Sequence, residues 1–429
     1  MNKNRFVTGS PIYVGIYAAL AAFLTYTMIF GFRKSFTVCT FDGMTVGSLS
    51  YKTVLVLSQM MGYLMAKFYG IKFIAELKRF GRNKIILLLV GIAWMAWLCF
   101  ALIPAPYNIP FLFINGFPLG MLWGVVFSYV EGRRSTDFIG AALAVSFIFS
   151  SGFVKSVGGW LIQWGVSEFW VPFCTGLVFA LPLLFFIYLM EKIPPPDEAD
   201  EALRMSRIPM SADQRKSFIK QFLPGIITCI VIYTFATLFR DIRDNFSADM
   251  WKEMGYINQP AIFSKTETPI SLIVLVLIGS MVMIKNSFRA LMVAHVLIAL
   301  GFVLAGISTW MFTKEMVSPM WWMILVGLGL YMVYIPFNAV FFERMIAAFR
   351  FTGNVGFLIY LADSFGYLGS VSVLLSKEIF KVQLNWVTFF SNSVLILSVV
   401  GALITIYAAW YFWRKYHKEI KHREHKLSL

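Results

Sequence analysis

The stretch Pro11–Lys34 reads PIYVGIYAALAAFLTYTMIFGFRK and carries no charged residue before Arg33. A helix needs roughly 20 apolar residues to cross a bilayer, so this stretch predicts a spanning helix rather than a cleaved signal peptide. The rest of the chain is similar, because 59% of its 429 residues are hydrophobic and only 14% are charged. Soluble domains have about 25% charged residues. The composition therefore indicates a multi-pass membrane protein and excludes a soluble enzyme, a nucleic-acid-binding domain and a fibrous protein.

Apolar runs of spanning length, bounded by charged residues, Pro or Gly, recur along the chain. We predict twelve spans, at 11–38, 51–70, 84–103, 111–131, 138–164, 170–190, 218–245, 268–284, 287–311, 319–348, 351–376 and 386–412.

The longest hydrophilic connection, 192–217, divides these spans into six plus six. The predicted fold class is an all-α membrane protein with two pseudo-symmetric six-helix halves, the arrangement of a major facilitator carrier. The predicted parts are an N-terminal half at 1–191, a cytoplasmic linker at 192–217, a C-terminal half at 218–412 and a basic tail at 413–429.

The basic residues in the connections predict the orientation. With the N-terminus inside, the cytoplasmic segments hold 25 Lys and Arg residues and the opposite loops hold six. Cytoplasmic loops carry the excess of Lys and Arg. Both termini are therefore expected in the cytoplasm, and the net charge of +15 reflects orientation rather than nucleic-acid binding. The short loops favour a bacterial inner membrane.

An internal repeat links the first helix of each half. Tyr26 precedes Arg33 by seven residues, Tyr233 precedes Arg240 by seven, and the offset between the two pairs is 207 residues. Seven residues are two helical turns, so each tyrosine is expected on the same helix face as its arginine. Tyr26 and Tyr233 are therefore candidate substrate-binding residues together with the arginines.

Charged side chains within spans are few, and each costs on the order of 2.5–3.5 kcal/mol near the bilayer centre. Arg33 and Lys34 either line a substrate cavity or extend to the outer headgroups. Lys67 has the same alternatives at the cytoplasmic end of its span. Lys155 either lines a cavity or forms a structural ion pair. Asp363 lies roughly 18 Å into its helix, where a carboxyl carries a coupling proton or pairs with a lysine.

The first span of the second half ends in TFATLFRDIRDNF, residues 234–246. Arg240 and Asp244 are four residues apart and are expected on one helix face. Asp241 and Asp244 are candidates for coupling or ion pairing. The cluster either forms a neutral outer cap or leaves one guanidinium in a cavity. In the second case an arginine from each half would clamp a dianion bidentately.

Other features carry less weight. His295 is either packed or a proton relay. The outer loop 245–267 either contains a short helix capped by Ser247 or is a plain structured loop. Four isolated cysteines predict no disulfide framework and no metal site. No hydrolase, phosphate-loop or zinc-protease motif occurs, so we expect no enzyme activity and no cofactor.

Four short motifs resemble the organophosphate:inorganic-phosphate antiporters, a branch of the major facilitator superfamily. Gly31–Phe36 is similar to their R-K-x-F segment, and Gly62–Phe68 to their Y-G-x-x-K-F stretch. Phe239-Arg240 matches the placement of their second arginine, and Phe365–Ser370 resembles their F-G-Y-x-G motif. The resemblance implies that Arg33 and Arg240 bind phosphate, that Lys67 assists, and that the halves rock during exchange.

Gating residues are expected at the cytoplasmic side. Arg79–Lys84 resembles the major facilitator loop signature between helices two and three, although Lys78 stands where an acidic residue is usual. The fourth and tenth spans both end in acidic–basic groups. The candidates are Arg79, Arg82, Glu131, Arg134, Glu343 and Arg344.

The sequence therefore predicts a secondary transporter of a small organic anion, phosphorylated or not, that works by phosphate exchange or proton coupling. The expected partners are the substrate and the lipid bilayer, and we expect a monomer. The alternatives are a non-transporting sensor of an anionic metabolite, an integral-membrane enzyme and a lipid transporter.

Overall fold

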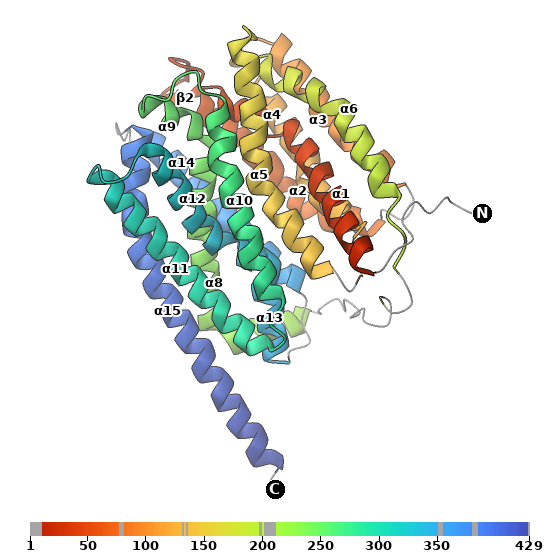
Figure 1. Ribbon diagram of the computed structural model, residues 1–429, viewed down its shortest axis with the longest axis vertical. Helices are drawn as coiled ribbons and strands as arrows, with labels where there is room; N and C mark the ends of the chain where they lie inside the picture. Colours follow the sequence, from red (N-terminus) through yellow and green to blue (C-terminus); the bar gives the residue numbers. More distant parts are fainter. Residues whose placement is uncertain are drawn as a thin grey trace, which may run out of the picture. The chain divides into compact units, whose positions relative to one another are not determined.

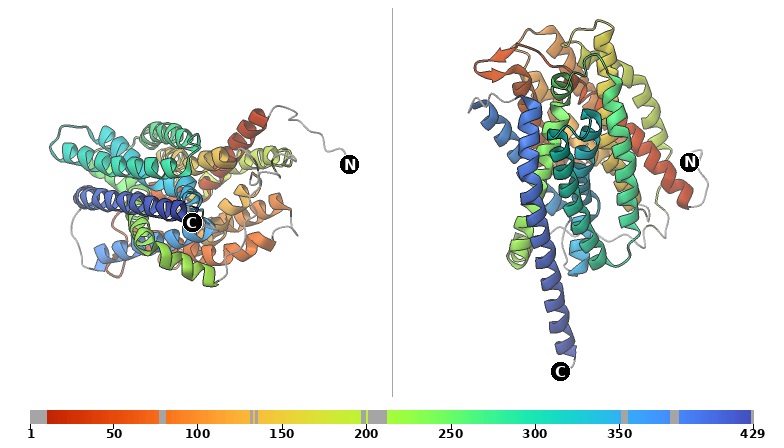
Figure 2. Two further views of the ribbon diagram at one scale, coloured as in Figure 1. Left: turned by 90° about the horizontal axis from the view of Figure 1, so that it is seen from below. Right: turned by 60° about the vertical axis from the view of Figure 1, so that its left-hand side comes forward.

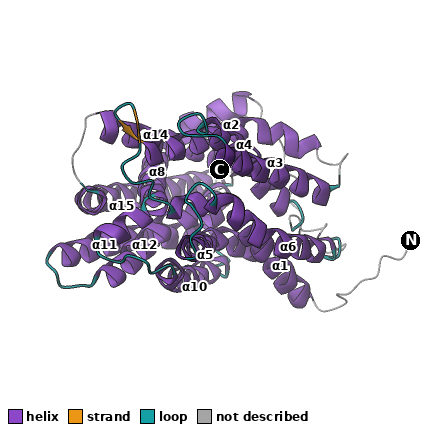
Figure 3. Cartoon of the chain, turned by 90° about the horizontal axis from the view of Figure 1, so that it is seen from above, coloured by secondary structure: helices purple, strands orange, loops and turns teal. Residues whose placement is uncertain are grey.

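The computed structural model describes residues 11–76, 81–130, 133, 136–196, 200, 212–350, 355–379 and 385–427. Nearly all of these residues are helical (Figure 3). The helices before residue 192 are α1 (Pro11–Gly31), α2 (Tyr51–Glu76), α3 (Arg82–Leu102), α4 (Pro110–Phe127), α5 (Thr136–Gln163) and α6 (Val171–Glu191). A 3-10 turn, η1 (Ser35–Val38), follows α1, and an antiparallel hairpin of β1 (Thr45–Val46) and β2 (Leu49–Ser50) leads into α2.

The later helices begin after residue 211. They are α8 (Ala212–Asn245), α9 (Ser247–Glu253), α10 (Ala261–Val282), α11 (Ser287–Thr313), α12 (Pro319–Pro336), α13 (Phe342–Ala348), α14 (Val355–Ile379) and α15 (Trp386–Leu427). A π-helical turn, η3 (Phe337–Phe341), joins α12 to α13. The basic residues after 412 extend α15 without a break, which gives the long terminal helix of Figures 1 and 2.

Ten helices in the described part of the chain are long and apolar enough to cross a membrane. They coincide with ten of the predicted spans. Helices α2 and α14 occupy the other two predicted positions but are not among the ten. The count of twelve spans therefore stays a prediction.

Several predicted span boundaries differ from the helix ends. The first span was expected to continue to 38, but α1 ends at Gly31 and a turn separates it from η1. The eighth was expected to begin at 268, but α10 begins at Ala261. The loop before α10 contains the short helix α9, whose N-cap is Phe246 rather than Ser247.

The chain forms two compact units, each made of three segments of the sequence. The first contains Met1–Arg204, Ile242–Leu272 and Val371–Val387, and the second contains Met205–Asp241, Ile273–Ser370 and Thr388–Leu429. The first unit thus includes the end of α8, all of α9 and the start of α10.

Glycines allow close helix approaches inside each unit. In the first unit α2 packs along α4, and a Cβ on Gly62 would lie 2.3 Å from the carbonyl oxygen of Phe113. In the second unit α11 packs along α12, and a Cβ on Gly301 would lie 2.6 Å from the carbonyl oxygen of Gly329. Small residues at such contacts are typical of membrane helices, because lipid tails are as apolar as leucine and packing must drive association.

Candidate functional site

Three side chains from neighbouring helices hold the turn after α1. Trp97 Nε1 donates to the carbonyl oxygen of Phe32 over 2.6 Å, and Asn115 Nδ2 donates to the same oxygen over 3.0 Å. Gln59 Nε2 donates to the carbonyl oxygen of Arg33 over 2.9 Å. Carbonyls at a helix end lack helical partners, so these donors stabilise the chain where α1 stops. Arg33 therefore lies on a turn, and the expectation that it shares a continuous helix face with Tyr26 is wrong.

Arg33 is stacked on an aromatic ring of α2. Its guanidinium carbon lies 3.9 Å from the ring centroid of Tyr63 and 5.3 Å from that of Phe30. Lys67 follows Tyr63 by one helical turn and so lies on the same side of α2. Tyr26 is buried, with its ring centroid 5.2 Å from that of Phe147. The first unit thus holds two predicted substrate-binding cations near one tyrosine.

Lys34, Lys155 and Asp244 form a second group in the first unit, which we call the Asp244 cluster. Lys34 Nζ lies 2.7 Å from Asp244 Oδ2, and Lys155 Nζ lies 2.7 Å from Asp244 Oδ1. Lys34 also donates to Asn245 Oδ1 over 2.6 Å, and the Ser151 hydroxyl donates to Asp244. The lysine side chains are 7% and 3% exposed. Of the two sequence alternatives for Lys155, the structure places this lysine in an ion pair.

Further ion pairs lie at the same end of the first unit. They are Arg243–Glu267 at 2.7 Å, Lys52–Asp249 at 2.6 Å and Lys252–Asp42. Burial raises the pKa of the Asp249 carboxyl above its ordinary value, although Lys52 opposes this effect. The hydrogen bond from Lys252 lowers the pKa of the largely exposed Asp42 carboxyl.

Arg240 belongs to the second unit, where it pairs with its neighbour. Its Nη2 lies 2.6 Å from Asp241 Oδ1, and its guanidinium carbon lies 3.9 Å from the ring centroid of Tyr334. Ser370 donates to the other carboxylate oxygen of Asp241 over 3.2 Å. The expected partner four residues on, Asp244, binds the two lysines instead. Spacing favoured Asp244, because residues four apart on a helix are neighbours whereas adjacent residues do not face each other.

Asp363 accepts a hydrogen bond from the Tyr233 hydroxyl. The contact depends on close packing of α8 and α14, since a Cβ on Gly369 would lie 2.6 Å from Thr234 Cγ2. The ring centroid of Tyr233 also lies 5.3 Å from that of Tyr334. Tyr334 is the residue on whose ring Arg240 stacks. A buried carboxyl, two tyrosines and an arginine therefore lie together in the second unit.

The predicted gating residues are only partly described. Arg79, Glu131 and Arg134 lie outside the described residues. Arg82 begins α3, with its guanidinium carbon 5.1 Å from the Tyr129 ring centroid, and Glu343 and Arg344 lie on α13.

Some positioning residues were not predicted. Gln59 and Trp97 were not predicted from the sequence. The feature that could have identified Gln59 is its amide side chain beside apolar residues. His295 is packed between Phe341 and Phe412, at ring distances of 4.9 and 5.6 Å. This environment agrees with the packed alternative.

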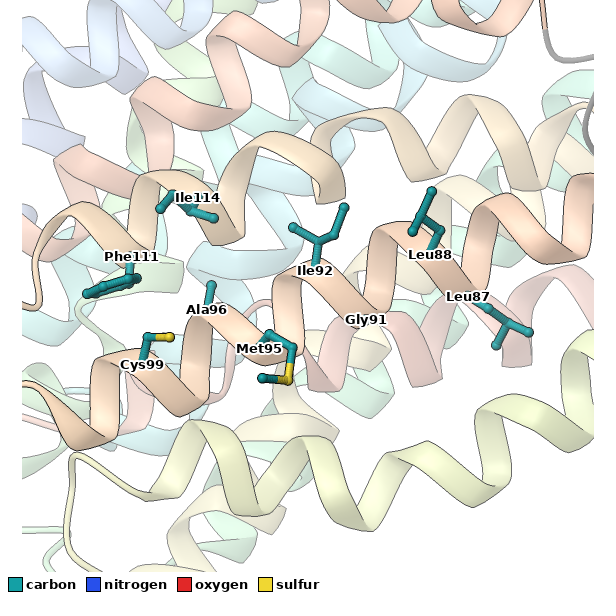
Figure 4. Close-up of a pocket in the computed structure, with 9 residues that line it drawn as sticks. All are labelled: Leu87, Leu88, Gly91, Ile92, Met95, Ala96, Cys99, Phe111 and Ile114. Atoms are coloured by element: carbon teal, nitrogen blue, oxygen red, sulfur yellow. The ribbon is translucent and has the colours of Figure 1, made fainter.

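A hollow on the surface of α3 and α4 is chemically different from these groups. Figure 4 shows the nine side chains that line it: Leu87, Leu88, Gly91, Ile92, Met95, Ala96, Cys99, Phe111 and Ile114. All of them are apolar apart from the weakly polar thiol. A site without polar partners cannot compensate the desolvation of an anion, so this hollow is not a candidate anion site.

The chain shares its fold with several solved membrane transporters. The chain resembles a bacterial homologue of the human lysosomal transporter Spinster, with 14% identity, a TM-score of 0.58, and 96% of this chain and 99% of that chain covered. It resembles the human organic anion transporter TETRAN, with 14% identity, a TM-score of 0.55, and coverage of 94% and 100%. A D-xylose–proton symporter is similar at 15% identity and a TM-score of 0.57, with coverage of 94% and 98%.

The chain belongs to the family DUF5690, described as a family of unknown function, whose model matches residues 35–415. No curated protein sequence gives a significant match. Two of these titles name different cargoes, an organic anion and D-xylose, so the likeness shows the fold alone and does not identify a cargo.

Proposed function

We propose that this protein is a secondary transporter that carries a small organic anion across the membrane by alternating access. The proposal is carried by one observation, the two arginines at repeat positions. Arg33 and Arg240 each stack on a tyrosine ring at 3.9 Å within their own compact unit. Cations in the interior of a membrane protein are costly and mark substrate or ion pathways. Guanidinium groups bind carboxylate and phosphate bidentately.

Arg33 is the proposed anion-binding residue of the first unit, with Lys67 as a further cation, and Arg240 is the proposed anion-binding residue of the second unit. Asp241 offsets the charge of Arg240, which limits the cost of keeping this arginine buried before a substrate binds. The motif resemblance supports a phosphorylated substrate. Phosphate exchange and proton-coupled uptake are the two modes, and Asp363 is the proton carrier in the second.

Thermal stability with matched ligand pairs tests the proposal. The pairs are glucose 6-phosphate against glucose and glycerol 3-phosphate against glycerol, with inorganic phosphate and succinate added. A ligand at a hundred times its dissociation constant adds about 2.7 kcal/mol of stability. We expect anions alone to stabilise the protein, and Arg33→Gln and Arg240→Gln to lose the response.

Lys252→Gln is the matched control, because it removes a cation that is 48% exposed and not part of the proposed site. An equal response to neutral ligands, or none to any anion, contradicts the anion site. Counterflow of the stabilising anion in liposomes then tests transport. Binding without counterflow indicates a sensor instead.

A further inference from the structure

Asp244 belongs by sequence to the second half of the chain but lies against helices of the first. It sits in the segment Ile242–Leu272, which is part of the first compact unit. Its two carboxylate oxygens each bind one ammonium group, Lys34 from the turn after α1 and Lys155 from α5, both at 2.7 Å. The two lysines carry two positive charges and Asp244 one negative charge.

This geometry is the one that an anionic ligand would adopt between two lysines. Carboxylate and phosphate oxygens accept charge-assisted hydrogen bonds of about 2.7–2.9 Å from ammonium donors. Asp244 therefore takes the position of a ligand carboxylate or phosphate. The nearby carboxylate of Glu267 is paired with Arg243, so it already has a cation of its own.

The contact between α5 and the segment Ile242–Leu272 includes glycines and hydrogen-bonded hydroxyl groups. On α5, a Cβ at Gly152 would lie 2.6 Å from the carbonyl oxygen of Phe263, and one at Gly159 would lie 2.9 Å from Pro260 Cβ. Ser156, between them, donates to the carbonyl oxygen of Pro260 over 2.7 Å. Its hydroxyl also accepts from the amide of Ser264 over 3.1 Å. Hydrogen bonds and glycine contacts of this kind can be exchanged for water, whereas an interdigitated apolar contact resists separation.

We propose that Lys34 and Lys155 form an anion-binding site, distinct from the two arginines, and that Asp244 is a tethered anion that occupies it until a substrate anion takes its place. This inference rests on the proposed anion transport. If the segment Ile242–Leu272 separates from α5, the two lysines lose the carboxylate between them. Leaving buried charges uncompensated is strongly destabilising. An arriving carboxylate or phosphate compensates the lysines and so favours the separated state.

The decisive measurement is the dissociation constant of inorganic phosphate, glycerol 3-phosphate and succinate for Asp244→Asn. The amide keeps the shape of the side chain and removes its charge, and so removes the competitor. We expect binding at least about tenfold tighter than for the unchanged protein, the scale of one lost charge-assisted contact. Adding Lys34→Gln or Lys155→Gln to Asp244→Asn should abolish the gain.

Asp249→Asn is the matched control, because it neutralises a buried carboxylate that binds one lysine, Lys52, in the same unit. It should leave anion affinity unchanged. Gly152→Ala provides a second variant that keeps every charge. Its Cβ obstructs the contact with Phe263, weakens the hold of Asp244, and should tighten anion binding in the same direction.

Unchanged or weaker anion binding in both Asp244→Asn and Gly152→Ala overturns the inference. If Arg33→Gln still abolishes binding in that case, the proposed function stands without it. If the unchanged protein and all variants fail to respond to anions, the proposed function fails as well. Equal tightening in Asp249→Asn also overturns the inference, since the effect would then come from general loosening of this end.

Discussion

At the residue scale, the two arginines each stack on a tyrosine ring but obtain that ring from different helices. Arg33 stacks on Tyr63 of α2, and Arg240 stacks on Tyr334 of α12, both at 3.9 Å. The repeat offset of 207 would place the counterpart of Tyr63 at Ile270. The tyrosine partners are therefore not related by the repeat. A ring face attracts a guanidinium.

Replacing either arginine by lysine tests whether this planar geometry matters. A lysine keeps the charge but offers a point donor in place of a two-pronged one. We expect Arg33→Lys and Arg240→Lys to weaken anion binding by about tenfold or more, the loss of one charge-assisted hydrogen bond, as measured by titration calorimetry. Lys252→Arg, at an exposed position, should have no effect. Unchanged anion affinity in both variants would show that the positive charge, and not the planar guanidinium geometry, determines binding.

Asp363 is tested by separating two transport modes. Asp363→Asn keeps a polar group next to Tyr233 but cannot release a proton. We expect uptake driven by a pH gradient to be lost and anion exchange without a gradient to be retained, as measured with labelled anion in liposomes. Loss of both modes would show that Asp363 is needed for binding or structure and is not solely a proton carrier.

At the element scale, helix ends and helix contacts depend on residues that are distant in sequence. The apolar run that makes α1 continues past Gly31, yet α1 stops where Gln59, Trp97 and Asn115 supply donors to the carbonyls of the next two residues. The turn directs Arg33 and Lys34 to different partners, Tyr63 and Asp244.

Asn115→Leu should destabilise the protein by about 1–3 kcal/mol, because it removes two buried hydrogen bonds. Asn115 donates to the carbonyl oxygens of Phe32 and Ala93 over 3.0 and 2.9 Å. Thermal unfolding of the purified protein measures the effect. Ile114→Leu, at a neighbouring position that is 42% exposed, should be neutral. A neutral Asn115→Leu would mean that other groups satisfy these carbonyls.

The contact between α2 and α4 is tested by side-chain volume. A Cβ on Gly116 would lie 2.4 Å from the carbonyl oxygen of Gln59, whereas one on Gly91 of α3 would meet nothing within 4 Å. Gly116→Val should destabilise the protein by about 1–3 kcal/mol or more through overpacking. Gly91→Val faces open space and should change the melting temperature little. Equal effects of the two substitutions would contradict the close approach.

At the scale of the whole molecule, the charge bias gives a topology that can be measured. The excess of Lys and Arg predicts that the end of α15 lies in the cytoplasm and that α9 lies outside. The orientation must be known before an effect of adding a ligand to one side of the membrane can be assigned to particular loops.

Single cysteines at Lys421 and Lys252 test the orientation with a membrane-impermeant maleimide. We expect Lys252→Cys to be labelled in intact cells and Lys421→Cys only after permeabilisation. Cys39 and Cys229 are buried, and Cys99 and Cys174 are replaced by alanine to lower the background. The reverse labelling pattern would invert the predicted topology and exchange the inner and outer assignments of every loop.

The sequence by itself determined the class of fold and the ten helices that satisfy the length and hydropathy of a membrane span. Backbone groups in lipid must be satisfied within each helix, so an apolar run of sufficient length is a local signal that needs no knowledge of its neighbours. The same reasoning identified the charged residues in the spans, because each is conspicuous among apolar residues.

Which charge pairs with which was decided by the tertiary structure alone. Spacing suited Asp244 to pair with Arg240, four residues away. Asp244 instead binds Lys34 and Lys155, which are separated from it by 210 and 89 residues. Ion pairs and helix ends depend on donors brought together by packing, and linear spacing carries no information about residues that meet only after the chain has folded.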